Sequence, residues 1–204
     1  RAKYLYDRIS QYTIIKDKSF LDVGSGYGSV VFQFAKMGTK ESIGIDVEIE
    51  NVDYSELNTN KTRAKIIQSD IVNTSFSDDT FDIIHTNSIE HFPQPFKAFN
   101  EIIRLTKKGG FIFLYLGNFW HCADASHFYN HLNIPWSHFL FDHDLLFRFA
   151  KENSFEFYGE TAAEFSNRVI EQFKSLNKIS LYDYKHMIFS RVDLEILHYL
   201  EKPV

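Results

Sequence analysis

The residues best suited to chemistry form an acidic residue and a glycine-rich turn near the start of the chain. An apolar run over residues 20–23 carries Asp22, and glycines alternate with other residues directly after it, at Gly24, Gly26 and Gly28. Glycines let the backbone turn tightly and let a ligand approach the main chain closely. A helix-compatible segment, residues 29–37, follows at once, and its unpaired N–H groups should point at that ligand. Turns that bind dinucleotides read G-x-G-x-x-G and hold a pyrophosphate, which the carboxylate here would repel, so the pattern favours a ligand with a cationic end.

Two more aspartates accompany short apolar runs. Asp46 is part of the run over residues 42–47 and lies about 20 residues beyond the glycine turn, the separation at which an adjacent parallel strand delivers an acid to a ribose diol. Asp70 follows the run over residues 64–69, and with the apolar Ile71 it could accept from an exocyclic amine and pack on an adenine ring. The alternatives are a solvated aspartate at a strand end for Asp46 and a helix-capping or turn aspartate for Asp70.

Strands and helices are predicted to alternate over residues 1–117. The expected strands are almost continuously apolar and lie at 18–23, 42–47, 64–69, 81–85 and 111–116, and the expected helices lie at 1–12, 29–36 and 96–105. Lysines and glycines over residues 107–110 are expected to cap and end the last of these helices. Continuously apolar strands are typical of a parallel sheet covered on both faces, and therefore of a doubly wound α/β fold. Ligands bind at the carboxyl ends of such strands, and each acid named above lies at such an end.

Six segments taken together resemble the successive motifs of the class I S-adenosylmethionine-dependent methyltransferases: residues 21–28, 44–46, 69–71, 81–84, 90–91 and 107–111. The resemblance implies a Rossmann-like fold and S-adenosylmethionine as the cofactor. Carried over by position, it assigns residues to each part of the cofactor: Asp22, Gly24, Ser25, Gly26 and Gly28 to the amino-acid end, Asp46 to the ribose, Asp70 and Ile71 to adenine, and Asn87 to the sulfonium. Val47 is a further expected cofactor-binding residue.

The resemblance also implies a mostly parallel seven-stranded sheet whose last two strands form an antiparallel hairpin at the edge. The expected sixth and seventh strands lie at residues 155–158 and 186–192, with a helical insertion over residues 160–184 between them. The chain is expected to be a single domain, residues 1–204, in which residues 117–144 overhang the cofactor site as a substrate lid.

Residues 117–144 are rich in histidine and aromatic side chains, and three interpretations stay open. His127 and His131 are four apart and could bind a metal with Asp124 or His121. Alternatively, the aromatics wall an acceptor pocket in which one histidine is the general base: His121, His127 or His138. The third interpretation is a Phe-rich lid whose histidines make ordinary hydrogen bonds.

A methyl sulfonium is electrophilic, so a methyltransferase need only align an acceptor and remove its proton where needed. A hydroxyl acceptor needs a base, and the histidine-rich segment therefore favours O-methylation of a small molecule, including a sugar or a nucleotide-linked hydroxyl. His91 is a second candidate base, with packing beside Glu90 as its alternative role. The alternative functions are an N- or carboxyl-methyltransferase of a small metabolite, a subunit that binds S-adenosylmethionine without turnover, and a nicotinamide-dependent oxidoreductase, which the turn spacing disfavours.

Composition limits the partners. A net charge of −5 without a Lys/Arg stripe argues against binding a nucleic-acid backbone, and residues 87–90 read Asn-Ser-Ile-Glu where base-modifying amino-methyltransferases carry Asn/Asp-Pro-Pro-aromatic. The single Cys122 excludes an internal disulfide and a four-Cys zinc site, and no apolar run approaches the roughly 20 residues of a membrane span. We therefore expect a cytoplasmic enzyme with a small-molecule acceptor, no nucleic-acid or membrane partner and no bound metal, with a homodimer as the assembly to test.

Overall fold

The structure is a computed structural model, and it describes residues 2–49, 64–117, 120–125 and 127–200. Its contacts divide the chain into two compact units. The first comprises Arg1–Ile89 and Gln94–Tyr115, and the second comprises Glu90–Pro93 and Leu116–Val204. The single-domain organisation expected from the sequence stays a prediction.

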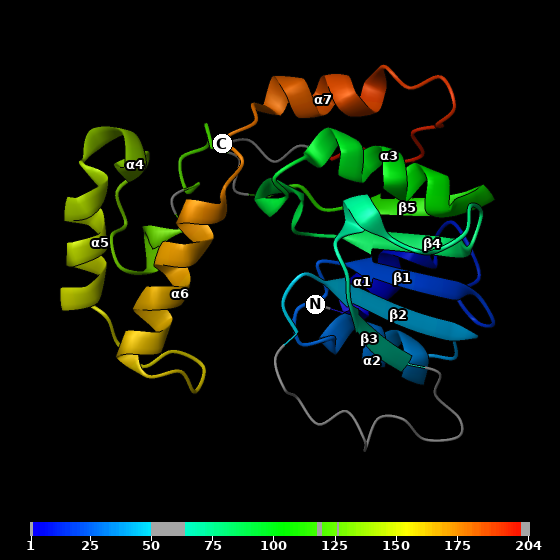
Figure 1. Cartoon of the computed structure of the whole chain (residues 1–204), viewed down its shortest axis with the longest axis horizontal. Helices are drawn as coiled ribbons and strands as arrows, with labels where there is room; N and C mark the ends of the chain where they lie inside the picture. The colour runs from blue at the N-terminus through cyan, green and yellow to red at the C-terminus, as the bar shows by residue number, and fades with distance from the viewer. Residues whose placement is uncertain (1, 50–63, 118–119, 126, 201–204) are drawn as a thin grey trace. The chain divides into compact units, whose positions relative to one another are not determined.

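Five parallel strands form the sheet of the first unit, in the order β3-β2-β1-β4-β5 (Figure 1). Their bounds are β1 Ser19–Val23, β2 Glu41–Asp46, β3 Ala64–Gln68, β4 Phe81–Thr86 and β5 Thr106–Leu114. The strand order reverses between β1 and β4, and at such a switch point the neighbouring loops diverge and leave a crevice at the carboxyl ends of the strands. The doubly wound parallel sheet predicted from the sequence is confirmed for these strands.

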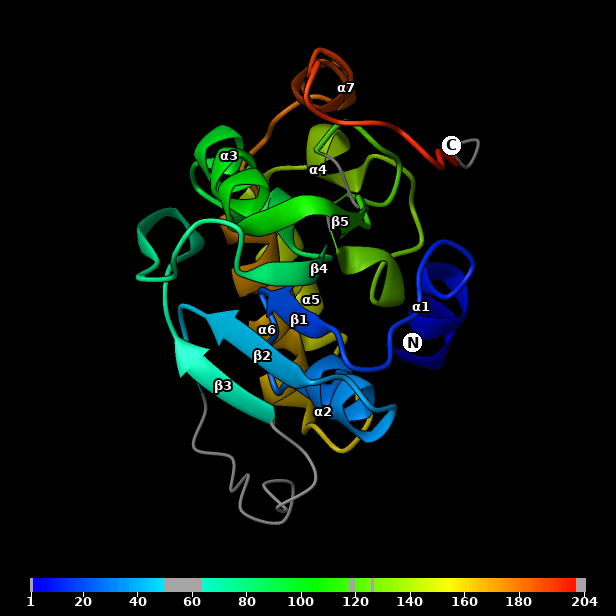
Figure 2. The ribbon, with the colours of Figure 1, turned by 90° about the vertical axis from the view of Figure 1, so that its right-hand side faces the viewer.

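Right-handed crossovers decide which face of the sheet each helix covers. Helix α2 (Ser29–Lys36) connects β1 to β2 in one direction across the sheet, whereas α3 (Pro95–Leu105) connects β4 to β5 in the other. Figure 2 shows α1 (Ala2–Ile9) and α2 on one face and α3 on the opposite face. Under α1 and α2, the ring of Phe20 stacks on that of Phe34 with centroids 4.1 Å apart, beside the buried side chains of Leu5, Ile9 and Ile83.

The start of the last strand differs from the expectation. Residues 107–110 do not end a helix but belong to β5, which begins at Thr106 directly after α3. Thr106 pairs with Phe81, and the next paired residues are Ile83 and Phe111, so the ladder shifts its register in between. Gly109 in this stretch has a φ of 74°, a left-handed conformation that glycine adopts without a Cβ clash and that suits a bulge.

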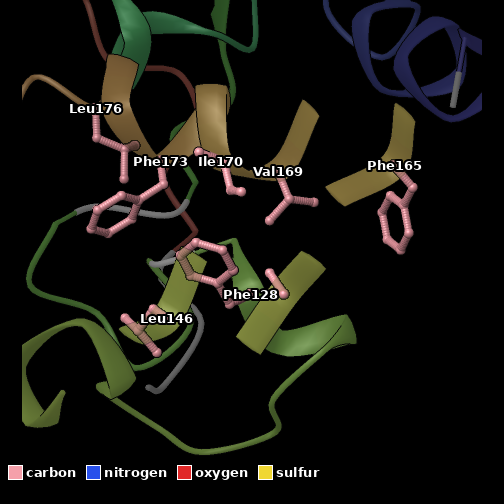
Figure 3. Close-up of a cluster of buried hydrophobic side chains, with 8 residues drawn as sticks. Phe128, Leu146, Phe165, Val169, Ile170, Phe173 and Leu176 are labelled. Carbon is pink, nitrogen blue, oxygen red and sulfur yellow. The ribbon is translucent and has the colours of Figure 1, made fainter. Parts of the chain in front are cut away.

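The second unit is built from short helices: η3 (Phe128–Asn130), α4 (Ser137–Leu140), α5 (His143–Glu152), α6 (Ala162–Ser175) and α7 (Leu181–Phe189). The side chain of Asp142 caps α5, and Thr161 with Glu164 forms a reciprocal capping box at the start of α6. Helix α6 turns its apolar face inward, and Figure 3 shows Phe173 of this helix facing Phe128 in the core of the unit. The helical insertion expected at residues 160–184 therefore corresponds to α6 and the start of α7.

The predicted seven-stranded sheet with an antiparallel edge hairpin is wrong for the residues that the structure describes. Residues 155–158 contribute only an isolated bridge between Phe157 and Glu160, and the expected strand at 186–192 is instead occupied by α7 as far as Phe189. The Ser180 side chain accepts from the N–H of Asp183 and starts this helix. Its buried residues, Tyr184 and Met187, are three apart, which matches a helical period and not the period of two of a strand.

Asp82, near the start of β4, accepts several hydrogen bonds at the amino ends of the strands. Its Oδ2 atom accepts from the Ser19 N–H at 2.9 Å, the Ser19 hydroxyl at 2.6 Å and the Lys107 ammonium at 2.9 Å. Burial alone would raise the pKa of Asp82, but these hydrogen bonds and the Lys107 charge hold that pKa well below its usual value.

Replacing Asp82 by Asn should therefore lower the free energy of unfolding at pH 7 by about 1–2 kcal/mol. Because a carboxylate with a depressed folded-state pKa stabilises above its unfolded pKa of about 3.9, the difference from the native chain should shrink as the pH falls below that value. Urea denaturation at several pH values measures this, with the exposed Asp79→Asn as the control. An equal loss of stability at every pH would contradict the assigned role of the charge.

Candidate functional site

The glycine turn after β1 is held by main-chain hydrogen bonds to the neighbouring strand. The N–H groups of Gly24 and Ser25 both donate to the Ile45 carbonyl of β2, at 2.9 Å and 3.1 Å. Gly24, Gly26 and Gly28 all have positive φ values, at 73°, 50° and 72°, which a residue with a Cβ adopts only under strain. A Cβ on Gly26 would meet nothing within 4 Å, whereas one on Gly28 would lie 2.6 Å from the Ile66 side chain. The turn therefore packs tightly at Gly28 and leaves open space at Gly26.

Asp46, the last residue of β2, reaches back to this turn. Its Oδ2 atom accepts from the Gly26 N–H at 2.8 Å. Next along the chain, the Val47 side chain is 59% exposed, and the N–H of Ser69, which follows β3, donates to the Asp46 carbonyl at 2.9 Å. The predicted meeting of the glycine turn with the ends of β2 and β3 is thus present, although the roles of these residues toward a cofactor stay predictions.

Asp22 has a partner that the sequence analysis missed. It lies in β1 opposite His85 of β4, and its Oδ1 atom is 2.6 Å from the His85 Nδ1 atom, with both side chains only 5% exposed. The pair sits on the same sheet face as Phe20 and Ile83, two residues earlier in each strand. Asp22 is therefore committed to a buried contact inside the sheet, and the register of β1 against β4 is the signal that would have found His85.

Asp70 acts as a helix cap, as its alternative interpretation proposed. Its Oδ1 atom accepts from the Val72 N–H at 3.0 Å and so starts the short helix η1 (Ile71–Asn73). Ile71 is buried. After β4, Asn87 is half-buried, and the hydroxyl of its neighbour Ser88 donates to the Gly24 carbonyl at 3.4 Å. The loops after β1 and β4 therefore lie side by side at the switch point, and a role for Asp70, Ile71 or Asn87 toward adenine or the sulfonium stays a prediction.

The candidate catalytic histidines all belong to the second unit and gather in two places. The rings of His91 and His127 lie with centroids 5.2 Å apart. His121 and His138 both contact Phe139, with centroid distances of 5.9 Å and 4.3 Å. His138 is buried, and its Nε2 donates to the Trp120 carbonyl at 2.7 Å.

Burial lowers the pKa of His91 and of His138, because a low-dielectric surrounding disfavours the charged ring. For His127, burial and the nearby His91 lower the pKa to about 4. All three rings are therefore neutral at pH 7 and could accept a proton. Within the part of the chain that the structure describes, no group of three or more His, Cys, Asp or Glu side chains is placed to hold a metal ion.

Comparison with known proteins shows which proteins the sheet region of this chain resembles. Residues 21–114, from β1 to the end of β5, match the family described as "Methyltransferase domain". An uncharacterised methyltransferase of Mycobacterium leprae is 33% identical over 95 residues, which are 46% of this chain and 35% of that protein. An uncharacterised methyltransferase of Schizosaccharomyces pombe is 32% identical over 108 residues, 48% of this chain and 39% of that protein. The matches thus span little more than a third of these relatives' length, and they concern the sheet and its loops.

Two solved structures each superpose on about half of the chain. The YcgJ protein of Bacillus subtilis superposes with a TM-score of 0.48 at 27% identity, over 55% of this chain and 50% of that one. A SAM-dependent methyltransferase from Aquifex aeolicus superposes with a TM-score of 0.43 at 25% identity, over 50% of this chain and 58% of that one.

The residues at the carboxyl edge of the sheet fit S-adenosylmethionine, the cofactor of this kind of domain. The open space at Gly26 lets a ligand reach the main chain, and Asp46 places a half-exposed carboxylate where ribose hydroxyls could donate to it. The exposed Val47 offers an apolar surface beside that carboxylate. The side chain of Ser25 points toward Gly44 of β2 and not into the space at Gly26, because a Cβ on Gly44 would lie 2.6 Å from the Ser25 Oγ atom.

Replacing Asp46 by Ala should weaken the binding of S-adenosylhomocysteine by about 1–3 kcal/mol, because the ribose donors and the Gly26 N–H would lose their acceptor. Calorimetric titration measures the affinity. Glu48→Ala, which removes a nearby exposed carboxylate, is the matched control and should leave the affinity unchanged. Equal affinities for the native chain and Asp46→Ala would contradict the ribose assignment.

Proposed function

We propose that this chain, whose residues 21–114 form a class I S-adenosylmethionine-dependent methyltransferase domain, methylates a hydroxyl group of a small molecule, either a sugar or a nucleotide-linked compound. S-adenosylmethionine, when bound, supplies an electrophilic methyl group. A hydroxyl has a pKa far above 7, so the protein must remove its proton as the new bond forms. The observation that carries the choice of a hydroxyl is the environment of His91.

Hydrogen bonds decide which His91 nitrogen carries the proton. The Ser175 hydroxyl donates its only hydrogen to the Gln172 carbonyl at 2.9 Å. The same oxygen lies 2.8 Å from the His91 Nδ1 atom, and we assign it as the acceptor of an Nδ1–H group, since one hydroxyl hydrogen cannot serve both contacts. In a neutral ring, the Nε2 atom is then the proton acceptor. Because burial lowers the pKa of His91, the ring holds this form at neutral pH and meets the two requirements of a general base.

The chain places His91 shortly after β4, the strand whose carboxyl end borders the switch point. Thr86 is the last residue of β4, and His91 closes the short helix η2 (Ile89–His91) that follows. The support for His91 as the base is therefore its protonation form, together with this position along the chain. Residues 117–144 as a substrate lid and His121, His127 and His138 as alternative bases stay predictions.

The remaining partners are proposals as well. No helix in the described parts of the chain is both long and apolar enough to cross a membrane. A small-molecule acceptor is consistent with the acidic net charge of −5. The expected cytoplasmic location and homodimer stay predictions.

His91→Ala should cut turnover by about 10²–10⁴-fold, the usual contribution of a general base. The measurement is methyl transfer from S-adenosylmethionine to a metabolite pool, read as a gain in mass, followed by kinetics on the acceptor so identified. His186→Ala, which removes an exposed histidine of α7, is the control and should keep full turnover. An unchanged rate in His91→Ala would contradict the base and would favour an amine or carboxylate acceptor.

The pH dependence separates a base from a structural histidine. A protonated ring cannot accept a proton, so turnover should be level near pH 7 and fall only below the usual histidine pKa of about 6.5. Ser175→Ala removes the partner of Nδ1 and should lower kcat and shift this acid limb while leaving cofactor affinity unchanged. An acid limb that keeps its position in Ser175→Ala would contradict the orienting role of the serine.

A further inference from the structure

The second unit contains a cavity of about 380 Å³ that the proposed chemistry has not used. Its walls come from the region around η3, from the turn at residues 157–158 and from α6. A volume of this size is within the range of small-molecule sites, about 300–1,000 Å³. His127 is part of the wall, and its ring lies 5.2 Å from that of His91 between centroids.

A strained turn presents an aromatic ring at this cavity. Phe157 and Glu160 exchange two main-chain hydrogen bonds, at 3.1 Å and 3.0 Å, across Tyr158 and Gly159. Tyr158 has a φ of 49° and is 96% exposed, although it lines the cavity. A left-handed conformation is uncommon for a bulky residue, and such strain clusters at ligand sites because the surroundings must enforce it.

Both ends of the turn are fixed. The Phe157 ring stacks on that of Phe165 with centroids 4.4 Å apart and planes 13° from parallel. The Glu160 carboxylate receives two hydrogen bonds from the Arg168 guanidinium, each 2.7 Å long. The Tyr158 ring also packs edge-to-face on the Phe157 ring, with centroids 4.5 Å apart, so it is held at the cavity on a fixed support while remaining almost fully exposed.

Charge in the cavity is balanced. The Arg168 guanidinium lines it but is paired in a bidentate contact with Glu160. Burial, together with the nearby His91, lowers the pKa of His127 to about 4, so this ring is neutral at pH 7. The other polar side chains of the wall are neutral: Tyr129, Asn130 and Gln172. A phosphate, a carboxylate or an amine would find no opposite charge that is not already paired.

We propose that this cavity, within the second unit, binds a neutral sugar ring. A pyranose has a face of C–H bonds and a rim of hydroxyls. The face of Tyr158 suits the C–H bonds, and the amides of Asn130 and Gln172 can donate to and accept from the hydroxyls. The Gln172 Oε1 atom already accepts from the Arg168 guanidinium at 3.4 Å, so the amide N–H groups of Gln172 are the donors that it offers to a sugar hydroxyl.

The test is saturation-transfer difference NMR on the full chain, without cofactor, against methyl glycosides of glucose, galactose, mannose and a 6-deoxyhexose at about 10 mM, which saturates a millimolar site. Galacturonate, glucosamine and phenol are the charged and apolar probes. At least one neutral glycoside should receive saturation on its ring C–H protons. Tyr158→Ala should lower the affinity for that glycoside by about 2- to 10-fold, the range of one aromatic contact. Gln172→Ala should lower this affinity as well. Tyr182→Ala, which removes an exposed tyrosine of α7, should bind as the native chain does.

Three results would overturn the sugar site: no signal from any neutral glycoside, stronger binding of a charged probe or of phenol, or equal binding by Tyr158→Ala and the native chain. A separate titration with S-adenosylhomocysteine distinguishes the two proposals. If the chain binds the cofactor but no sugar, the sugar site is rejected and the proposed methyltransferase function is retained. If the chain binds a sugar but no cofactor, the proposed function is rejected and the sugar site is retained.

Discussion

The candidate cofactor site depends on how the end of β2 supports the turn after β1. The Ile45 carbonyl accepts two N–H groups of the turn, and the Asp46 carboxylate accepts a third, from Gly26. Close packing makes this possible, because a Cβ on Gly44 would lie 2.6 Å from the Ser25 Oγ atom and 2.5 Å from the Ile66 side chain. Gly44 of β2 is therefore as necessary to the shape of the site as the glycines of the turn, because a larger residue there would clash with the turn. Parallel pairing brings these groups to the same edge, and everything proposed about methyl transfer relies on that edge.

The sequence predicted most of the first unit, since continuous apolar runs mark buried parallel strands. Each of the five strands lies where expected, with shifts of one or two residues at most ends. The early start of β5 is an exception, because Lys107 and Lys108 look like a helix end although they belong to a strand with a bulge. The Asp22–His85 contact could not be predicted from local pattern. It depends on the register of β1 against β4, and two residues far apart in the sequence carry no sign of that register.

The second unit was harder to predict, for physical reasons. The short apolar stretch at residues 187–189 fits a strand or a helix, and the Ser180 cap and the inward spacing of Tyr184 and Met187 decide for a helix. The strands expected at residues 155–158 and 186–192 were read from short apolar stretches, and their pairing as an edge hairpin came from the resemblance. The cavity combines His127, Tyr158 and Gln172 from three separated segments, so it emerges only when the chain has folded.

The central claim is that the turn after β1 and the acids beside it form a site for S-adenosylmethionine and not for a dinucleotide. Calorimetric titration of the full chain with S-adenosylhomocysteine and, separately, with NAD tests this most directly. We expect micromolar binding of S-adenosylhomocysteine, roughly −7 to −8 kcal/mol, and no measurable heat with NAD. Tighter binding of NAD, or no binding of either S-adenosylhomocysteine or S-adenosylmethionine, would contradict it.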